Sequence, residues 1–382
     1  MYQALYRKWR PMSFDDVVSQ PHITTTLKNQ IKSGKTAHAY LFTGSRGTGK
    51  TTCARIFAKA INCLDPHDGE PCLECEICKD ADNGTLSDII EIDAASNSKV
   101  DDIRELREGV VYTPERCKYK VYIIDEVHML STGAFNALLK TMEEPPPHVK
   151  FILATTEIHK VPATIVSRCQ HFDFHRIRNE DIVSRLMYIA SQEGFTLHED
   201  AAGMIARLSD GGMRDALSLL DQCVAYENDI TLDVVSSASG IAGRDYLFDI
   251  LEKIAEKDAA GALRVVDKLY DMSKDLKVLA GELLAQMRNV MIIKTIDNNK
   301  DLITCLPDEY ERLKALAERM KLDEILGDIN TLQECSERFA KSTSKRIELE
   351  MCIIKLCGAA QKAGASVQAV SGNAEVTVLL NR

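Results

Sequence analysis

The sequence predicts an α/β core built on a parallel sheet, followed by regions built of helices alone. Over roughly the first 175 residues, short apolar runs alternate with amphipathic stretches, which is the pattern of strands joined by crossover helices. After about residue 178 the strand pattern stops, and apolar residues recur at spacings of three and four. This change in period predicts a mixed domain first and helical domains after it.

Length and composition exclude several classes of protein. The 382 residues are enough for two or three domains, and 45% hydrophobic with 27% charged residues is typical of globular chains. A net charge of −10 argues against a protein that coats DNA, although residues 1–60 carry a local balance of +8. There is no run of 18 apolar residues and no secretory signal, so we expect a cytoplasmic protein without a membrane span.

The elements of the core follow from the apolar runs. Strands are predicted at residues 39–43, 87–93, 120–125, 150–155 and 171–174, with helices between them at 51–62, 100–110 and 132–144. Beyond the core, Ile182, Leu186, Ile189 and Ala190 share one helical face, and Gly211-Gly212 breaks the pattern before a helix at 213–226. We expect a core at 1–178, a helical domain at 179–242, a second helical domain at 243–365 and a flexible tail at 366–382.

A phosphate-binding loop lies between the first strand and the first core helix. The segment fits G-x-x-x-x-G-K-[ST] and reads Gly44-Ser45-Arg46-Gly47-Thr48-Gly49-Lys50-Thr51, followed by Thr52. Glycines let successive backbone N–H groups point inward at phosphate oxygens, and the N-terminus of the next helix favours negative charge. We expect Lys50 to reach the β- and γ-phosphates of a nucleotide and the Thr51 hydroxyl to bind Mg²⁺.

The acidic end of the strand at 120–125 supplies the second half of such a site. Asp125 is placed to hold Mg²⁺ through water, and Glu126 to orient and deprotonate the attacking water. His128 follows two residues later, and we interpret it as a structural or interface histidine.

Four of the 12 cysteines are clustered, in the pattern Cys63-x8-Cys72-x2-Cys75-x2-Cys78. Thiolates at this spacing can converge on one tetrahedral ion, and four of them leave no open position, so the site is expected to be structural. Zn²⁺ is preferred over an iron–sulfur cluster, since nothing nearby suggests electron transfer. The cluster interrupts the path from the first core helix to the second strand, and a protein-contact surface is one hypothesis for its role. The other eight cysteines are interpreted as ordinary thiols.

Further motifs give the sequence a family resemblance. They are Asp125-Glu126-Val127-His128, the run Phe135–Lys140, Glu143-Glu144-Pro145-Pro146, Ser167-Arg168-Cys169, Tyr6–Pro11 and Glu91–Ser96. In these the chain resembles the AAA+ clamp-loader ATPases, and among them the gamma/tau subunits of bacterial DNA polymerase III. The resemblance is strong over residues 1–220 and weakens to a helical pattern over 240–360. The length of the chain is similar to that of the short gamma form or of a piece of the longer tau form.

The resemblance implies roles for residues that would otherwise be assigned to the surface. Thr156, or its neighbour Thr155, would be the sensor that contacts the γ-phosphate and the attacking water. Arg214 would be a second sensor on the helical lid, and Arg168 an arginine finger that acts on the nucleotide of the next subunit. Segment 2–20, with Pro11, Val17 and Val18, would pack on the adenine and ribose. The cysteine cluster would be the zinc module of that family.

The resemblance also implies an activity and partners. The chain would be an ATP-driven switch that, with copies of itself and with delta and delta-prime subunits, opens the beta sliding clamp and loads it on primer–template DNA. A longer form would also meet the polymerase core and a helicase. Residues 243–365 would serve oligomerisation, and nucleotide addition would belong to another subunit. Residues 96–99 are a candidate DNA phosphate contact, although an ordinary helix cap is an equal interpretation.

Two other functions remain open from the sequence. Another AAA+ machine, such as a branch-migration motor, would share the phosphate loop and the acidic strand end. A scaffold that binds ATP without cleaving it is the non-enzymatic alternative, against which Lys50, Thr51, Asp125 and Glu126 argue.

Overall fold

The computed structural model describes residues 3–96, 109–240, 245–297, 299, 302–303, 305, 307–339 and 342–358. The chain divides into two compact units, Met1–Ser239 and Gly240–Arg382. Several sequence predictions lie outside the described residues: the proposed DNA contact at 97–99, most of the helix at 100–110, the boundary at 241–243 and the tail at 366–382.

The first unit begins with the α/β core. Its elements are α1 (Leu5–Lys8), α2 (Pro21–Ser33), β1 (Ala39–Gly44), α3 (Lys50–Asn62), α4 (Glu76–Asn83), β2 (Ile89–Asp93), β3 (Lys120–Asp125), the 3-10 turn η1 (Val127–Met129), α6 (Thr132–Glu143), β4 (Val149–Thr155), the 3-10 turn η2 (Ile158–Lys160), α7 (Ala163–Val166) and β5 (Gln170–Phe174). All five predicted strands are confirmed, with bounds that differ by at most two residues.

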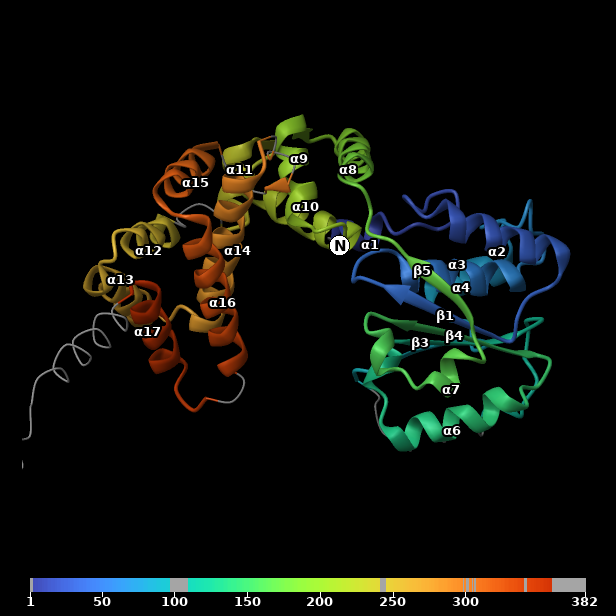
Figure 1. The fold of residues 1–382 in the computed structure, drawn as a ribbon. Helices are drawn as coiled ribbons and strands as arrows, with labels where there is room; N and C mark the ends of the chain where they lie inside the picture. Colours follow the sequence, from blue (N-terminus) through green and yellow to red (C-terminus); the bar gives the residue numbers. More distant parts are fainter. Residues whose placement is uncertain are drawn as a thin grey trace, which may run out of the picture. The chain divides into compact units, whose positions relative to one another are not determined.

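The five strands form one parallel sheet in the order β2-β3-β4-β1-β5. Helices α2, α3 and α4 lie on one face of the sheet, and α6 and α7 lie on the other (Figure 1). Because every strand runs in the same direction, the carboxyl ends of all five meet at one edge. Gly44, Asp93, Asp125 and Thr155 each end a strand at this edge.

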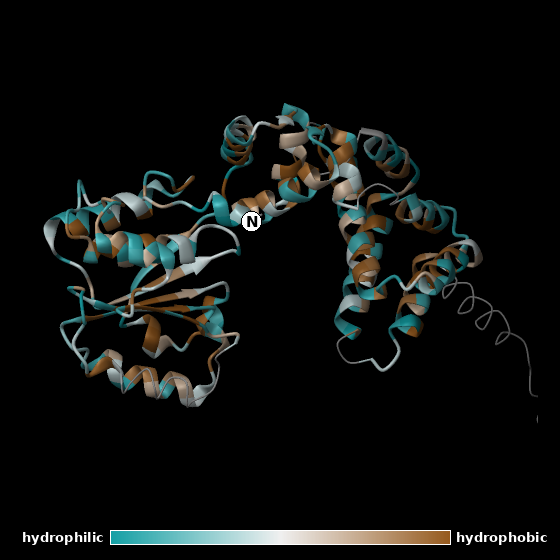
Figure 2. Ribbon diagram, turned by 180° about the vertical axis from the view of Figure 1, so that it is seen from behind, coloured by the Kyte–Doolittle hydropathy of each residue, from teal (hydrophilic) through white to brown (hydrophobic). Residues whose placement is uncertain are grey.

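The three central strands, β3, β4 and β1, are buried on both faces, which explains their continuous apolar runs, whereas the edge strands β2 and β5 are partly exposed. On β1, Tyr40 and Phe42 pack with α2 and α3, whereas Ala39 and Leu41 pack on the side of α6. In Figure 2 the inner strands are largely hydrophobic, while the helices carry a hydrophobic and a hydrophilic side. The result is a three-layer core with the carboxyl ends of its strands at one edge.

The rest of the first unit is the helical lid. It contains α8 (Asn179–Glu193), β6 (Thr196–Leu197), α9 (Glu199–Leu208), α10 (Met213–Tyr226), β7 (Asp229–Ile230) and α11 (Leu232–Ala238). The predicted face of α8 is confirmed, because Ile182, Leu186, Ile189 and Ala190 are all buried. The expectation that strands stop after residue 178 is wrong in one detail: β6 and β7 pair in parallel, and strands of two residues are too short to show a pattern.

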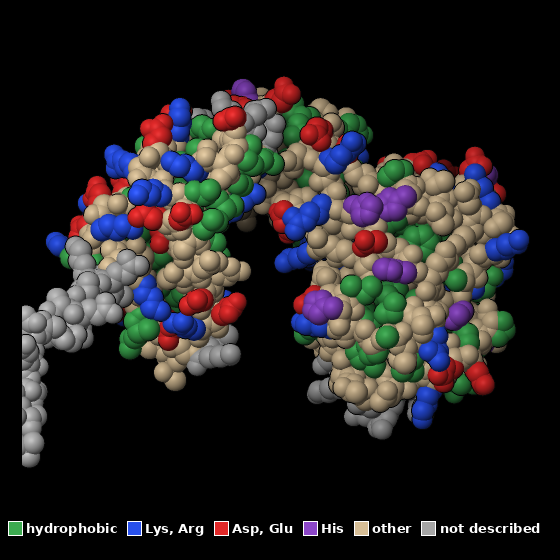
Figure 3. All heavy atoms as spheres, viewed as in Figure 1, with side chains coloured by type: hydrophobic (Ala, Val, Ile, Leu, Met, Phe, Trp, Pro, Cys, Tyr) green, Lys and Arg blue, Asp and Glu red, His purple; other side chains and the backbone are tan. Residues whose placement is uncertain are grey.

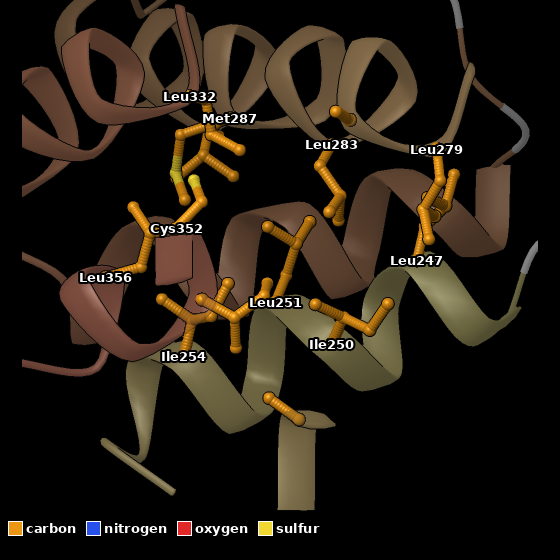
Figure 4. Packing of buried hydrophobic residues seen from close by; sticks show 14 of the residues in the cluster. Leu247, Ile250, Leu251, Ile254, Leu279, Leu283, Met287, Leu332, Cys352 and Leu356 are labelled. Atoms are coloured by element: carbon orange, nitrogen blue, oxygen red, sulfur yellow. The ribbon is translucent and has the colours of Figure 1, made fainter. Parts of the chain in front are cut away.

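The second unit is helical over its described residues. Its helices are α12 (Asp245–Ala255), α13 (Ala259–Asp271), α14 (Leu276–Thr295), α15 (Pro307–Arg319), α16 (Leu322–Arg338) and α17 (Lys345–Leu356). One apolar cluster joins them, and Figure 4 shows side chains from several helices pointing toward one another. The labelled members are Leu247, Ile250, Leu251 and Ile254 of α12, Leu279, Leu283 and Met287 of α14, Leu332 of α16, and Cys352 and Leu356 of α17.

The surface of the second unit carries charges of both signs. On the face drawn in Figure 3, Lys and Arg side chains lie beside Asp and Glu side chains. Arg312 is one centre of such contacts and bonds to Asp245, Asp249 and Glu252 of α12 at 3.0, 3.2 and 2.9 Å. Among the residues that the structure describes, no helix combines the length and the apolar character needed to cross a membrane.

Candidate functional site

The loop after β1 crosses the carboxyl edge of the sheet and leads directly into α3. β1 ends at Gly44, where a Cβ would lie 2.3 Å from the carbonyl oxygen of Phe174, so only glycine fits there. α3 begins at Lys50, immediately after Gly49. The unpaired backbone N–H groups at the start of α3 therefore face the loop, where they favour an anion.

Lys50 is folded back onto the loop that precedes it. Its Nζ donates to the carbonyl oxygens of Gly44 and Ser45, at 2.8 and 2.7 Å. Burial lowers the pKa of Lys50, and the nearby carboxylates of Glu126 and Asp125 act in the opposite direction. The ammonium group thus lies inside the loop, at the place where phosphate oxygens would offer it stronger acceptors than carbonyl groups.

Thr51 and Asp125 join the loop to the end of β3. The Thr51 hydroxyl donates to Asp125 Oδ2 at 2.7 Å, although the two residues are 74 positions apart in the chain. A hydroxyl and a carboxylate at one point are oxygen ligands of the type that Mg²⁺ prefers. The two side chains therefore fit the metal role that the sequence predicts for them.

Glu126 follows Asp125 in a left-handed backbone conformation, with φ of 47°. Its Oε2 accepts hydrogen bonds from the backbone N–H and the hydroxyl of Thr156, at 3.1 and 2.9 Å. Thr155, the other candidate sensor, is fully buried, and its hydroxyl oxygen accepts from the N–H of Glu157 at 3.0 Å. Of the two threonines, Thr156 is the one that contacts the proposed base.

A cavity of about 300 Å³ lies at this edge of the sheet. Its lining comes from the N-terminal segment, the phosphate loop, the ends of β2 and β3, and the lid. The residues are Tyr6, Trp9, Arg10, Pro11, Val17, Val18, Arg46, Gly47, Thr48, Gly49, Lys50, Thr51, Thr52, Asp93, Asp125, Glu126, Ile177, Arg185, Met213, Arg214 and Leu217. Of the predicted loop residues, Gly44 and Ser45 do not line it and instead supply the carbonyl oxygens that bind Lys50.

The N-terminal segment connects this cavity to the lid. Trp9 Nε1 donates to Glu193 of α8 at 2.6 Å, and the Trp9 ring meets the edge of Tyr188 at 5.8 Å. The sequence predicted that this segment covers the base and ribose, through Pro11, Val17 and Val18, and these three do line the cavity.

Four basic or aromatic side chains of the cavity, Tyr6, Trp9, Arg10 and Arg185, were given no individual role from the sequence. Tyr6 and Arg10 lie within the predicted segment, and the positive balance of the first 60 residues was the available signal for Arg10. Burial, and next to it the charge of Arg55, lowers the pKa of Arg10. Arg185 of α8 gave no signal, because its place depends on how the lid folds against the core.

The lid reaches the phosphate loop at the start of α10. The N–H of Met213 donates to the carbonyl oxygen of Gly47 at 3.0 Å, and a Cβ on Gly47 would lie 3.0 Å from the Cα of Gly212. The next residue, Arg214, lines the cavity, with its guanidinium 5.2 Å from the centre of the Tyr6 ring. The lid arginine expected from the sequence therefore lies in the cavity of its own chain.

Arg168 lies elsewhere, between α7 and β5. Its guanidinium donates to Glu143 Oε1 at 2.9 Å and to the carbonyl oxygen of Thr164 at 2.7 Å. The described lining of the cavity does not include it. Lys50, Thr51, Asp125, Glu126 and Arg214 thus line one cavity. Of the other predicted side chains, Arg168 lies apart, Thr156 contacts Glu126, and Ser45 does not line the cavity.

The four clustered cysteines form a second candidate site. Their Sγ atoms all lie within 4.8 Å of one another, and the pairs Cys63–Cys75 and Cys72–Cys78 are both 4.0 Å apart. A tetrahedron with metal–sulfur distances of about 2.3 Å has edges of about 3.8 Å, so the sulfurs fit one Zn²⁺ ion. Backbone N–H groups of Cys72 and Cys75 donate to neighbouring sulfurs at 3.3 Å, which favours thiolates.

The loop between these cysteines is joined to the N-terminal segment by one side chain. Glu70 Oε2 accepts from the N–H of Phe14 at 2.8 Å, and Glu70 Oε1 pairs with Lys28 of α2 at 2.9 Å. Gly69 packs so closely on Lys28 that a Cβ would lie 2.6 Å from its carbonyl oxygen. The candidate metal loop is therefore in contact with the segment that leads to Val17 and Val18 in the cavity.

Three family models, all of DNA polymerase III subunits, match consecutive stretches of residues 19–368. The family model of the DNA polymerase III delta subunit matches residues 19–178, that of the clamp loader subunit ATPase lid domain matches 181–229, and that of DNA polymerase III subunits gamma and tau domain III matches 230–368. Among solved structures, the branch migration motor RuvB of Thermotoga maritima aligns with a TM-score of 0.47 and 19% identity, over 65% of this chain and 80% of that one. A likeness of this size says nothing about function.

The curated relatives carry the same subunit names. The tau subunit of DNA polymerase III from Bacillus subtilis is 44% identical over 97% of this chain, which spans 66% of that protein. The gamma subunits from Buchnera aphidicola of Schizaphis graminum and of Acyrthosiphon pisum are 40% and 35% identical, over 83% and 94% of this chain and 87% and 99% of their own lengths. The chain thus spans nearly all of the short gamma subunits but less than two thirds of several tau subunits, such as 46% of the one from Escherichia coli.

The two gamma subunits match over 87% and 99% of their own length, and the three family models follow one another along the chain. The chain belongs to the gamma/tau family of bacterial DNA polymerase III clamp-loader subunits.

Proposed function

We propose that this chain hydrolyses ATP as a subunit of a bacterial clamp loader. The observation that carries the proposal is the hydrogen bond of 2.7 Å between Thr51 and Asp125, because it joins the phosphate loop and the acidic strand end beside one cavity. Lys50 and Glu126 line the same cavity, so the groups that ATP hydrolysis needs are assembled around it.

Each side chain of the proposed site has a separate task. Lys50 exchanges its two carbonyl partners for oxygens of the β- and γ-phosphates. Thr51 and Asp125 would hold Mg²⁺, which when bound neutralises charge on those phosphates. Glu126 accepts the proton of the attacking water. Thr156 donates a hydrogen bond to the carboxylate of Glu126 and so orients that carboxylate.

Two arginines add positive charge from different directions. Arg214 approaches the phosphates from the lid of the same chain, consistent with its place in the cavity lining. Arg168 serves the nucleotide of the neighbouring subunit, consistent with its position outside its own cavity. Hydrolysis on this account needs an assembly, since no single chain supplies both arginines to one nucleotide.

The assembly we propose contains several copies of this chain with delta and delta-prime subunits, joined through residues 243–365. It opens the beta sliding clamp and places it on primer–template DNA in the bacterial cytoplasm. Polymerase core and helicase contacts belong to a longer form of the chain, and nucleotide addition belongs to a different subunit. We also propose that Cys63, Cys72, Cys75 and Cys78 hold one structural Zn²⁺ ion, which their sulfur distances support.

The test is ATP turnover by the reconstituted complex with and without sliding clamp and primed DNA. We expect clamp and DNA together to raise turnover, and Lys50→Ala in every copy of the chain to abolish the increase. If neither ligand changes turnover, a different AAA+ activity, such as branch migration, becomes the better interpretation. If turnover is the same with Lys50→Ala, the chain is a scaffold that binds ATP without cleaving it.

A further inference from the structure

The histidine that follows the acidic end of β3 is buried between two carboxylates. His128 lies in the turn η1, and its side chain is only 6% exposed. Its Nδ1 lies 3.3 Å from Glu126 Oε2, and its Nε2 lies 3.1 Å from Glu157 Oε2. The ring therefore bridges the proposed catalytic base and a carboxylate that belongs to the turn after β4.

The same ring also contacts the end of β4 itself. Nδ1 lies 3.0 Å from the hydroxyl oxygen of Thr155, and the same oxygen accepts a hydrogen bond from the N–H of Glu157. Whichever nitrogen carries the hydrogen, Nδ1 faces the Thr155 hydroxyl and Nε2 faces the Glu157 carboxylate. This fixes the ring orientation, because both of its nitrogens are engaged by groups of β4 and the turn that follows.

Glu126 is held from two sides as a consequence. Thr156 donates twice to Glu126 Oε2, at 3.1 and 2.9 Å, and the His128 ring lies against the same oxygen. Removal of the ring would leave the Thr156 bonds but would free the carboxylate to swing on them. General-base catalysis depends on the distance of that carboxylate from its water, and an error of about 1 Å is enough to lower a rate about 100-fold.

We propose that His128 is a positioning residue for ATP hydrolysis, with Glu157 as the group that orients its ring. The inference rests on the proposed function, because it assigns Glu126 as the base. It goes beyond that function by linking hydrolysis to the turn after β4, which supplies both Thr156 and Glu157. A histidine that only fills space in the core would affect folding and ATP binding as much as turnover.

Glu157 itself is exposed to solvent on its other side. Lys160 lies 2.7 Å from Glu157 Oε2, and the exposed ring of His159 lies 3.8 Å from Glu157 Oε1. His159 thus approaches the same carboxylate as His128 but makes no described contact with Glu126. It provides a matched control for the loss of a histidine beside Glu157.

The experiment compares variants of the full chain in the reconstituted complex, with clamp and primed DNA present. For each variant, kcat and KM of ATP hydrolysis are measured, together with the Kd of a non-hydrolysable ATP analogue and the thermal unfolding temperature. We expect His128→Ala to lower kcat roughly 10–100-fold while the Kd changes by less than about twofold. His159→Ala is expected to leave both constants within about twofold of the unaltered chain.

Two further variants keep the test informative if His128→Ala fails to fold. His128→Asn places an amide near the position of Nδ1, whereas His128→Gln places one near Nε2. We expect the asparagine variant to retain more of kcat, because it preserves the contact on the side of Glu126. Glu157→Ala is expected to lower kcat about threefold to tenfold, and to have no further effect in a chain that already carries His128→Ala.

The outcomes separate this inference from the proposed function. If the unaltered complex does not hydrolyse ATP, the proposed function fails and His128 has no reaction to serve. If it does hydrolyse ATP and His128→Ala leaves kcat unchanged, or His128→Gln retains as much of kcat as His128→Asn, only the positioning role is overturned. A rise in Kd as large as the fall in kcat would overturn it as well, since that result indicates a structural role.

Discussion

The two candidate sites of the first unit are built in opposite ways. The four cysteines lie within 16 residues of sequence, and their sulfurs converge through the turns of a single loop. The nucleotide cavity is lined by residues from Tyr6 to Leu217, which come from the N-terminal segment, three strand ends or loops, and the lid. One site is local in the chain, and the other exists only when the whole unit is folded.

Because of this difference, only the nucleotide site can respond to movements between parts of the chain. A local site with four thiolates is complete in one chain and stabilises the loop that carries it. A site made of distant pieces responds to motion between the pieces, as at the contact between Gly47 of the phosphate loop and Met213 of the lid. The proposed arginine finger would add a residue from a neighbouring chain to the nucleotide site.

The largest expected effect tests whether the nucleotide site is incomplete in one chain. Arg168→Ala in the reconstituted complex should lower ATP turnover roughly 10³–10⁵-fold, because the charge that develops in the transition state loses its partner. The affinity for ATP should change by less than about threefold, since Arg168 does not line the cavity of its own chain. Turnover and equilibrium nucleotide binding are the measurements.

A second exposed arginine serves as the control for Arg168. Arg116 pairs with Glu76 and Asp80 at 3.1 and 2.6 Å, much as Arg168 pairs with Glu143. Arg116→Ala should leave turnover unchanged. Loss of ATP binding in Arg168→Ala would contradict the assignment to the neighbouring subunit, because a residue acting on another chain's nucleotide cannot hold its own.

The second prediction tests whether the cysteine site is complete in one chain. Cys72→Ser should abolish the single zinc ion per chain that elemental analysis is expected to find. It should cost about 3 kcal/mol of unfolding free energy for the first unit, which lowers Tm by roughly 6–12 °C. Cys117→Ser, which removes a partly buried thiol outside the cluster, should retain the metal. Equal metal content in the two variants would rule out the four-cysteine site.

The third prediction tests the contact between loop and lid. Gly47→Ala should weaken ATP binding about tenfold, or about 1.4 kcal/mol, because a Cβ would push against the Cα of Gly212, 3.0 Å away. Its left-handed φ of 77° should add about 1–2 kcal/mol of destabilisation. Gly34→Ala has a similar φ of 68° and open space, so it should lower stability without any effect on ATP affinity. Equal ATP affinities for the two variants would show that the lid contact does not shape the site.

The smallest expected effect lies where the two sites touch. Glu70→Ala removes the acceptor for the N–H of Phe14 and the partner of Lys28, and should cost about 1–2 kcal/mol of unfolding free energy. ATP affinity should fall about twofold to fivefold, because the segment after Phe14 leads to Val17 and Val18 in the cavity. Glu70→Gln keeps an acceptor oxygen, so its effect should be about half as large. An unchanged affinity in Glu70→Ala would mean that the two sites are independent.

Much of the core could be predicted because its three central strands are buried on both faces. Such strands leave continuous apolar runs, and all five predicted strands are present. The buried face of α8 was likewise visible in the spacing of Ile182, Leu186 and Ile189. The pair β6 and β7 was missed because a strand of two residues shows no alternation of polar and apolar residues. Arg185 was missed because nothing in the sequence distinguishes a single arginine on a helix from an ordinary surface residue.

The sequence by itself determined the phosphate loop and the four-cysteine cluster. Both motifs consist of defined residue types at short, fixed spacing, so they can be recognised without knowing how distant parts of the chain pack. Only the tertiary structure decided that Thr51 bonds to Asp125, that Arg214 and Tyr6 share one cavity, and that His128 bridges Glu126 and Glu157. These contacts join elements whose distance in space depends on the order of the strands and on the packing of the lid, which no local pattern specifies.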